Sequence, residues 1–151
     1  IATLRSPRIR ASEYATLKGG EQLTMTRAIL PQLPYNQEAL EMSDGGMAAF
    51  GPMDLTDVRG LEFLLDLRAE ESQTGQIEVL LDDPQGVAVA QIAVQPVSTT
   101  SRALVKRTLV VPAAMGQHTL YFRFSANNGD GNRPICRLLS FTLKTEFSVV
   151  N

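Results

Sequence analysis

The sequence has no tryptophan, one cysteine and one histidine among its 151 residues. Because Cys136 is the single cysteine, the chain has neither an internal disulfide nor a CxxC metal knuckle. No stretch approaches the roughly 20 consecutive apolar residues that a membrane-spanning helix needs. The chain also has no large excess of either charge, since 14 basic and 16 acidic residues leave a formal net charge of -2. A nucleic acid or an anionic membrane is therefore not an expected partner, and a neutral partner fits best.

Residues for catalysis are equally scarce. His118 lies in "GQHTLYFRF", where strand alternation places it on the apolar side and favours a partly buried structural histidine over a general base. There is no GxSxG turn and no phosphate-binding glycine pattern. The carboxylate pairs Asp82 with Asp83 and Glu70 with Glu71 are adjacent and point apart, whereas a glycosidase needs two facing carboxyls roughly 5 to 9.5 Å apart. The sequence therefore predicts a protein without enzymatic activity.

What the chain does have is alternation of apolar and polar residues with a period of two, which is typical of half-buried strands. In "DDPQG", Pro84 and Gly86 predict a hairpin turn between two such runs. "YNQEALEM" allows at most one helical turn, and residues 43–46 read as a turn. Roughly nine or ten strands predict an all-β fold, an antiparallel sandwich or barrel. The expected strands lie at residues 8–16, 21–27, 45–55, 61–69, 76–83, 86–94, 105–111, 117–125 and 138–147.

The chain shows no internal repeat and no low-complexity linker, so residues 1–151 are expected to form one domain. Its first residues, "IATLRSPRIR", contain neither an initiator methionine nor the apolar core of a signal peptide. We therefore expect a domain that was processed or excised from a larger protein.

The stretch "FSANNGDGNRPIC", residues 124–136, is the densest cluster of polar turn-forming residues. It imitates an EF-hand calcium loop, but Arg133 stands at the position of the required glycine and Leu139 at that of the glutamate. Gly129 and Gly131 permit the positive φ angles of a turn. Two readings remain, a plain connection between strands and a loop that binds a ligand.

Four segments, in this order, resemble the family 6 carbohydrate-binding modules. They are "PRIRASEYA", the stretch from "SDGGMAAFGPMDL" to "LEFLLDLRA", "GQIEVLLDDPQGVAVAQIAVQP" and "MGQHTLYFRFSA". The resemblance covers about residues 8–145. It implies a jelly-roll sandwich that binds a polysaccharide or oligosaccharide without catalysis. It also implies an accessory role beside neighbouring domains of a secreted or periplasmic bacterial protein.

The family's sugar site implies both polar and aromatic residues. Family members usually carry a tryptophan shortly before the strand matched by "VKRTLVV", and this chain has none. Since ring stacking on a sugar face supplies apolar contact, another ring must replace it. Tyr121 is a candidate for a second site on the sheet face. The carbohydrate-binding residues that the resemblance implies are Tyr35 and Phe50 for the rings, and Asn127, Asn128, Asp130 and Asn132 for the hydroxyls.

The family often holds a structural calcium ion, although no cofactor is required for sugar binding. The resemblance places Glu13, next to Ser12, and Gln22 near two of the ligand positions. Arg137 stands where a late aspartate is expected, and its charge would repel a cation.

Two functions therefore stay open. One is a carbohydrate-binding accessory module, which the asparagine-rich loop and the low net charge favour. The other is a structural or protein-docking domain that has lost sugar binding, which the missing tryptophan and the altered calcium positions favour.

Overall fold

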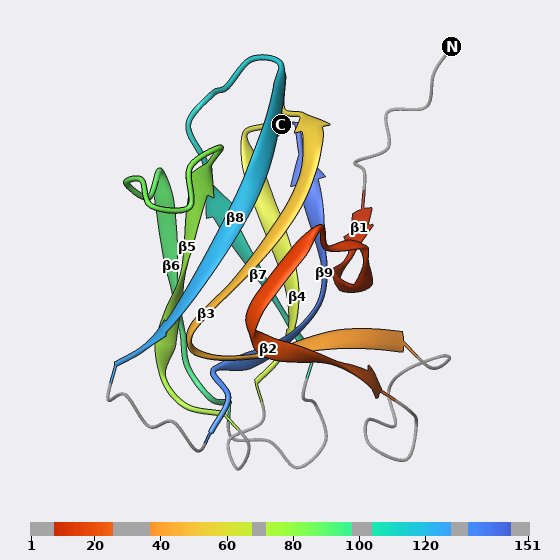
Figure 1. The fold of residues 1–151 in the computed structure, drawn as a ribbon, viewed down its shortest axis with the longest axis vertical. Helices are drawn as coiled ribbons and strands as arrows, with labels where there is room; N and C mark the ends of the chain where they lie inside the picture. The colour runs from red at the N-terminus through yellow and green to blue at the C-terminus, as the bar shows by residue number, and fades with distance from the viewer. Residues whose placement is uncertain (1–7, 26–36, 68–71, 98–103, 128–132, 146–151) are drawn as a thin grey trace, which may run out of the picture.

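The computed structural model describes residues 8–25, 37–67, 72–97, 104–127 and 133–145, which form nine strands and one short 3-10 helix (Figure 1). The elements are β1 (Arg8–Arg10), η1 (Ala11–Glu13), β2 (Thr16–Met25), β3 (Gln37–Asp54), β4 (Gly60–Asp66), β5 (Gly75–Leu81), β6 (Ala90–Val94), β7 (Leu104–Val110), β8 (Gln117–Ala126) and β9 (Cys136–Lys144). Within these ranges, no helix has the length and apolar character needed to cross a membrane.

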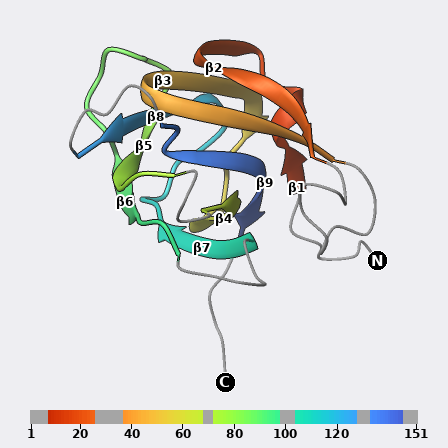
Figure 2. The same ribbon diagram turned by 90° about the horizontal axis from the view of Figure 1, so that it is seen from below.

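All the strand pairs are antiparallel, and the strand order is β6-β5-β8-β3-β9-β4-β7, with β1 on β9 and β2 on β3. β3 belongs to both layers, because its residues 40–42 pair with β9 and its residues 47–54 pair with β8. Figures 1 and 2 show β5, β6 and β8 on one side and β4, β7 and β9 on the other. The edge strands β6 and β7 contact each other, so the sheet nearly closes. The predicted all-β sandwich of jelly-roll type is confirmed.

The bend of β3 differs from what the sequence predicts. Residues 37–54 form one continuous strand, so both the turn at 43–46 and a helical turn over 37–42 are wrong. Gly45 has a φ of +85°, and a Cβ on Gly19 of the neighbouring β2 would lie 2.7 Å from Cα of Gly46. The glycines therefore let two strands bend together at close approach, where the sequence suggested a chain reversal.

The hairpin between β5 and β6 is confirmed, with Gly75 opposite Val94 and Val79 opposite Ala90. Its second strand is shorter than predicted, because β6 begins at Ala90 and not at residue 86. The Asp83 carboxylate accepts a hydrogen bond from the backbone N–H of Gln85 (2.9 Å), which holds the preceding residues in a turn.

Four phenylalanine rings fill the space between the layers. Phe50, Phe63, Phe122 and Phe141 come from β3, β4, β8 and β9, and each is fully buried. The ring of Phe122 lies edge-on to that of Phe141, with centroids 4.9 Å apart. Burial of each such side chain stabilises the fold by about 1.5–3 kcal/mol. This cluster therefore holds the two layers together and so fixes the positions of both ends of the sandwich.

Candidate functional site

The end of β8 carries Asn127, the predicted site residue that the structure places most informatively. Its backbone N–H donates to the carbonyl of Thr74 (3.0 Å), and the N–H of Ala126 donates to Oδ1 of Asp44 on the bend of β3 (2.8 Å). The Asn127 side chain is exposed and makes no hydrogen bond within the described part of the chain. A fixed backbone thus presents a free amide at this end of the sandwich, the lower end in Figure 1.

Gln73 fixes the other side of the same loop. Its N–H donates to the carbonyl of Pro134 (3.0 Å), and its Nε2 donates to the carbonyl of Arg133 (2.6 Å). The side chain is only 7% exposed. The N–H of Ile135 donates to the carbonyl of Met42 (2.7 Å). The described residues at the two ends of this loop are therefore tied to β3 and to the segment before β5, and we call these anchored residues, 126–127 and 133–135, the rim.

Of the other predicted sugar contacts, Phe50 is wrong. Its ring is fully buried between Phe122 and Phe141, at centroid distances of 5.5 and 4.9 Å. The cause is the pairing of β3 with β8, which puts Phe50 opposite the buried Leu120. A ring in that position has no face for a sugar. Tyr35, Asn128, Asp130 and Asn132 lie outside the described residues and stay predictions.

Tyr121 lies half-buried on the outer face of β8 and is the second aromatic candidate. It is in register with Ala49 of β3 and Leu80 of β5, both of which are buried. Two residues further along β8, Arg123 Nε donates to Glu78 Oε1 at 2.8 Å. Among the described aromatic residues, Tyr121 and Tyr14 are the two that are not fully buried, and Tyr14 packs against the core.

At the third ligand position that the resemblance implies, the side chain is Arg137, which already pairs with two carboxylates. Arg137 Nε donates to Glu41 Oε2 (3.0 Å) and Arg137 Nη1 to Asp66 Oδ2 (3.2 Å), so a guanidinium already neutralises these carboxylates. The amide of Gln22 donates to Glu38 Oε1 (2.9 Å). Across the described ranges, no three histidine, cysteine, aspartate or glutamate side chains are grouped to hold a metal.

Glu13, the other predicted calcium ligand, accepts a hydrogen bond from the backbone of Arg10 (3.3 Å) beside η1. Its carboxylate is exposed to solvent. A metal role for Glu13 and Gln22 stays a prediction.

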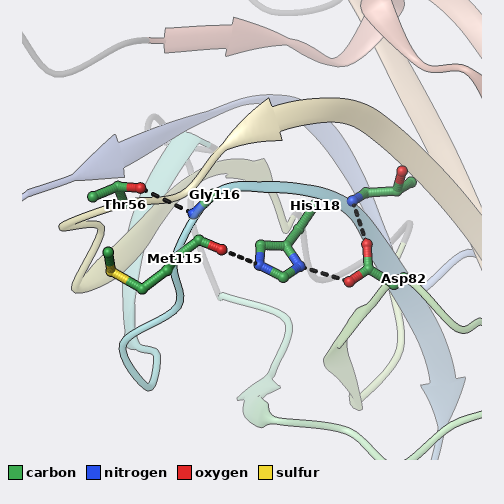
Figure 3. Close-up of polar contacts among 6 residues, drawn as sticks. Thr56, Asp82, Met115, Gly116 and His118 are labelled. Atoms are coloured by element: carbon green, nitrogen blue, oxygen red, sulfur yellow. Dashed lines mark hydrogen bonds and ion pairs between the residues drawn. The ribbon is translucent and has the colours of Figure 1, made fainter.

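At the opposite end of the sandwich, His118 lies in a polar cluster in which both of its ring nitrogens have hydrogen-bond partners within the protein (Figure 3). We call this the saturated cluster. His118 Nδ1 lies 2.6 Å from Asp82 Oδ2, and His118 Nε2 lies 2.7 Å from the carbonyl oxygen of Met115. Asp82 Oδ1 also accepts the N–H of Thr119 (2.9 Å). Since both ring nitrogens face acceptors, the doubly protonated imidazolium is the form that satisfies both.

These contacts shift two pKa values in opposite directions. The hydrogen bond to Asp82, and then that to the Met115 carbonyl, raise the pKa of His118. The hydrogen bond from His118, and then that from the Thr119 backbone, lower the pKa of Asp82. A partly buried structural histidine is thus confirmed, but its carboxylate partner is not found by sequence reasoning. Asp82 reads there as a solvated turn residue, and only the register of β8 against the end of β5 brings the two together.

The cluster lacks the parts of a nucleophilic site. A base needs one ring nitrogen free to take a proton from a nucleophile, and here the Met115 carbonyl accepts from Nε2. Cys136 is fully buried, and burial raises the pKa of its thiol, so the reactive thiolate is disfavoured. Within the described part of the chain, these polar groups connect the start of β8 with Met115 before it and with Asp82 after β5.

The fold defines a class, the β-sandwich domains of jelly-roll type. No protein-family model matches the sequence, and no curated protein matches it. Solved structures do, and the predicted likeness to family 6 carbohydrate-binding modules is confirmed for the fold.

Three of these structures illustrate the likeness. A family 6 module from Clostridium cellulolyticum, solved with xylose, is 22% identical with a TM-score of 0.70, over 91% of this chain and 96% of that one. A β-1,3-glucan-binding family 6 module from Bacillus halodurans is 16% identical with a TM-score of 0.73, over 91% and 95%. An arabinoxylan arabinofuranohydrolase from Bacillus subtilis, solved with cellotetraose, is 22% identical with a TM-score of 0.72, over 91% of this chain but 27% of the enzyme.

Proposed function

We propose that this chain is a non-catalytic carbohydrate-binding module whose sugar site lies at the rim. The observation that carries the proposal is the free amide of Asn127 on a backbone fixed by hydrogen bonds to Thr74 and, through Ala126, to Asp44. An amide oxygen accepts and an amide nitrogen donates, so one side chain pairs with two neighbouring hydroxyls of a sugar. A pre-organised backbone lowers the entropy lost on binding.

Four further residues, all outside the described ranges, complete this proposal. Asn128, Asp130 and Asn132 follow Asn127 in the sequence and extend the set of groups that bond hydroxyls. Tyr35 supplies the ring that stacks on the sugar, because Phe50 is buried in the core. The low net charge suits a neutral polysaccharide as the ligand at this end. We assign no catalytic residue and no required cofactor.

The module acts, in this proposal, by holding neighbouring domains of a secreted or periplasmic protein close to a polysaccharide. Support comes from the arabinofuranohydrolase, in which a domain of this fold makes up 27% of the chain. The family 6 modules solved with xylose and cellobiose bind their sugars as separate chains, of which this chain covers 96% and 94%.

Affinity electrophoresis tests the proposal. Native gels containing xylan, β-1,3-glucan or a soluble cellulose derivative are run with the wild type, with Asn127→Ala and with Gln117→Ala. Gln117 is the matched control, because it is an exposed amide at the opposite end of the same strand. We expect at least one polysaccharide to retard the wild type and Gln117→Ala equally. Asn127→Ala should bind about fivefold more weakly, as expected for one net hydrogen bond of about 1 kcal/mol.

Two results would count against the proposal. If no neutral polysaccharide retards the wild type, the sugar-binding function is wrong and a docking role for the domain takes its place. If Asn127→Ala and Gln117→Ala migrate alike in a gel that retards the wild type, the site lies elsewhere on the sandwich.

A further inference from the structure

The outer face of β1, β9, β4 and β7 contains a polar hollow that is separate from the rim. Its volume is about 210 Å³, and four adjacent strands contribute to it. The residues that line it are Arg8, Glu62, Leu64, Lys106, Ser140 and Thr142. The strand register explains their grouping, because Thr142 lies opposite both Arg8 and Glu62, and Leu64 lies opposite both Ser140 and Lys106. In Figure 1, β1 and β9 lie on the right of the view and β4 near its centre.

Arg8 is held in a defined orientation at one side of this hollow. Its Nε donates to Oγ of Ser140 at 3.1 Å, and the Ser140 side chain is only 3% exposed. The two Nη groups of Arg8 make no hydrogen bond within the described part of the chain. A guanidinium anchored through Nε and open at Nη1 and Nη2 offers two donors in the planar geometry that binds a carboxylate or a sulfate.

The charge of the hollow is positive although the chain as a whole is slightly acidic. Its one carboxylate, Glu62, already lies 4.0 Å from Nζ of Lys144. Neither Arg8 nor Lys106 has an ion-pair partner among the residues that the structure describes. Two cations from β1 and β7 therefore flank a floor of two hydroxyl groups and one apolar side chain, Leu64. The ligand that matches this surface carries an anion next to hydroxyl groups.

We propose that this hollow binds an acidic saccharide unit, a sugar that bears a carboxylate or a sulfate ester. Arg8 binds the anionic group with two parallel hydrogen bonds, and Lys106 contributes a second positive charge from the other side. Thr142 and Glu62 pair with hydroxyls, and Leu64 contacts the C–H groups of the ring. The site shares no residue with the rim, so this proposal can be tested independently of the neutral-sugar site proposed there.

Calorimetric titration with three polymers tests the proposal. Oligogalacturonate supplies carboxylates, dextran sulfate supplies sulfate esters, and dextran supplies hydroxyls alone. We expect at least one acidic polymer to bind, more weakly as salt rises because exposed charges are screened, and dextran to bind far more weakly. The acidic polymer that binds more tightly identifies the anion. Arg8→Gln should weaken that binding about tenfold or more, since hydrogen bonds between charged groups are strong.

Variants at matched positions separate this site from a general effect of charge. Lys18→Gln removes an exposed cation from β2, on the other layer, and should leave the affinity unchanged. Lys106→Gln should weaken binding of the acidic polymer. Glu62→Gln should strengthen it by about two- to fivefold, because a like charge is removed from the hollow. Each variant is exposed or half-exposed on a sheet face, and its melting temperature is measured alongside.

Three outcomes would overturn the proposal. One is that neither acidic polymer binds the wild type. Another is that dextran binds as tightly as the acidic polymer with the higher affinity. The third is that Arg8→Gln and Lys18→Gln lower the affinity equally. The rim is tested in the same series by Asn127→Ala, which should bind the acidic polymer as the wild type does, so failure of one site is distinguishable from failure of the other.

Discussion

The two ends of β8 show opposite uses of polar side chains. At one end His118 donates to Asp82 and faces the Met115 carbonyl, so both of its nitrogens are occupied by the protein. At the other end Asn127 is held by its backbone alone, and its side-chain amide has no partner in the described chain. The same strand thus has at one end a histidine whose hydrogen-bonding groups are occupied, the saturated end. At the other end an asparagine follows it whose amide is free to bind a ligand, the unsaturated end.

The difference bears on how a binding site is recognised. A histidine next to a carboxylate invites a catalytic reading, yet hydrogen bonds that are fully satisfied within the protein leave little to offer a ligand. A lone exposed asparagine is less conspicuous, but a free amide on a rigid backbone is what recognition of hydroxyls needs. The predictions below test this contrast, beginning with the core that carries both ends.

Replacement of Phe50 should affect both ends equally, because its ring belongs to the shared core. Phe50→Ala should lower the free energy of unfolding by about 3–5 kcal/mol, as large-to-small changes in a packed core do. Phe50→Leu should lower it by about 1 kcal/mol and leave sugar affinity unchanged. Urea denaturation and affinity electrophoresis check the two results. Loss of sugar binding in a Phe50→Leu protein of near wild-type stability would restore Phe50 as a binding residue.

Replacement of Arg137 tests whether a polar side chain close to the rim contributes to stability. Arg137→Met takes a cation from Asp66, which is only 1% exposed, and should lower the free energy of unfolding by about 3 kcal/mol. The double variant Arg137→Met, Asp66→Leu should recover much of that loss, because the nearly fully buried carboxylate is removed and the remaining partner, Glu41, is 23% exposed. Urea denaturation of both proteins measures the difference.

Calcium should leave the melting temperature of the wild type unchanged, and so should a chelator, because the Arg137 guanidinium already neutralises the nearby carboxylates. Thermal denaturation with calcium and with chelator is the measurement. A rise in melting temperature on addition of calcium would contradict the conclusion that Arg137 takes the place of a metal ion. The same holds if Arg137→Met is as stable as the wild type.

The smallest expected effect is the pH dependence of the His118 cluster. The pKa of His118 is raised, so its contribution to stability is complete below its unfolded value of 6.5 and is lost as pH rises through the folded pKa. The pKa of Asp82 is lowered, so its contribution is complete above its unfolded value of 3.8 and is lost as pH falls through the folded pKa. Stability from this pair is therefore greatest between these two values.

Asp82→Asn should flatten both slopes, and melting temperature against pH measures this. Asp57→Asn is the control, because Asp57 is an exposed loop aspartate with a φ of +67°, a backbone conformation that asparagine tolerates. Equal flattening in both variants would show that the pH dependence does not come from the His118 cluster.

Much of the fold follows from the sequence by alternation. The runs that became β4, β5 and β8 place every second residue inward, and hydrophobic burial then leaves few other arrangements. The glycines in residues 43–46 led to the wrong prediction of a turn. A positive φ is compatible both with a chain reversal and with the bend that β2 and β3 share. Only the pairing of β2 with β3 decides between them.

The candidate site was less accessible to sequence reasoning, because register sets which side chains meet. Phe50 falls in the expected strand 45–55, but only the register that sets it opposite Leu120 shows that its ring belongs to the core. Asp82 and His118 are 36 residues apart, and Arg8 and Ser140 are 132 apart. Asn127 was named from the resemblance, and its place at the end of the sandwich follows in almost any register because it directly follows an apolar strand. Its role in sugar binding stays a prediction.

The central claim is that sugar binding belongs to the unsaturated end of β8 and not to the saturated one. Titration calorimetry of Asn127→Ala and Asp82→Asn with the polysaccharide that retards the wild type tests it directly. We predict that Asn127→Ala binds about fivefold more weakly with an unchanged melting temperature, and that Asp82→Asn binds as the wild type does. Wild-type affinity in Asn127→Ala together with weakened binding in Asp82→Asn would contradict the claim and move the site to the His118 end.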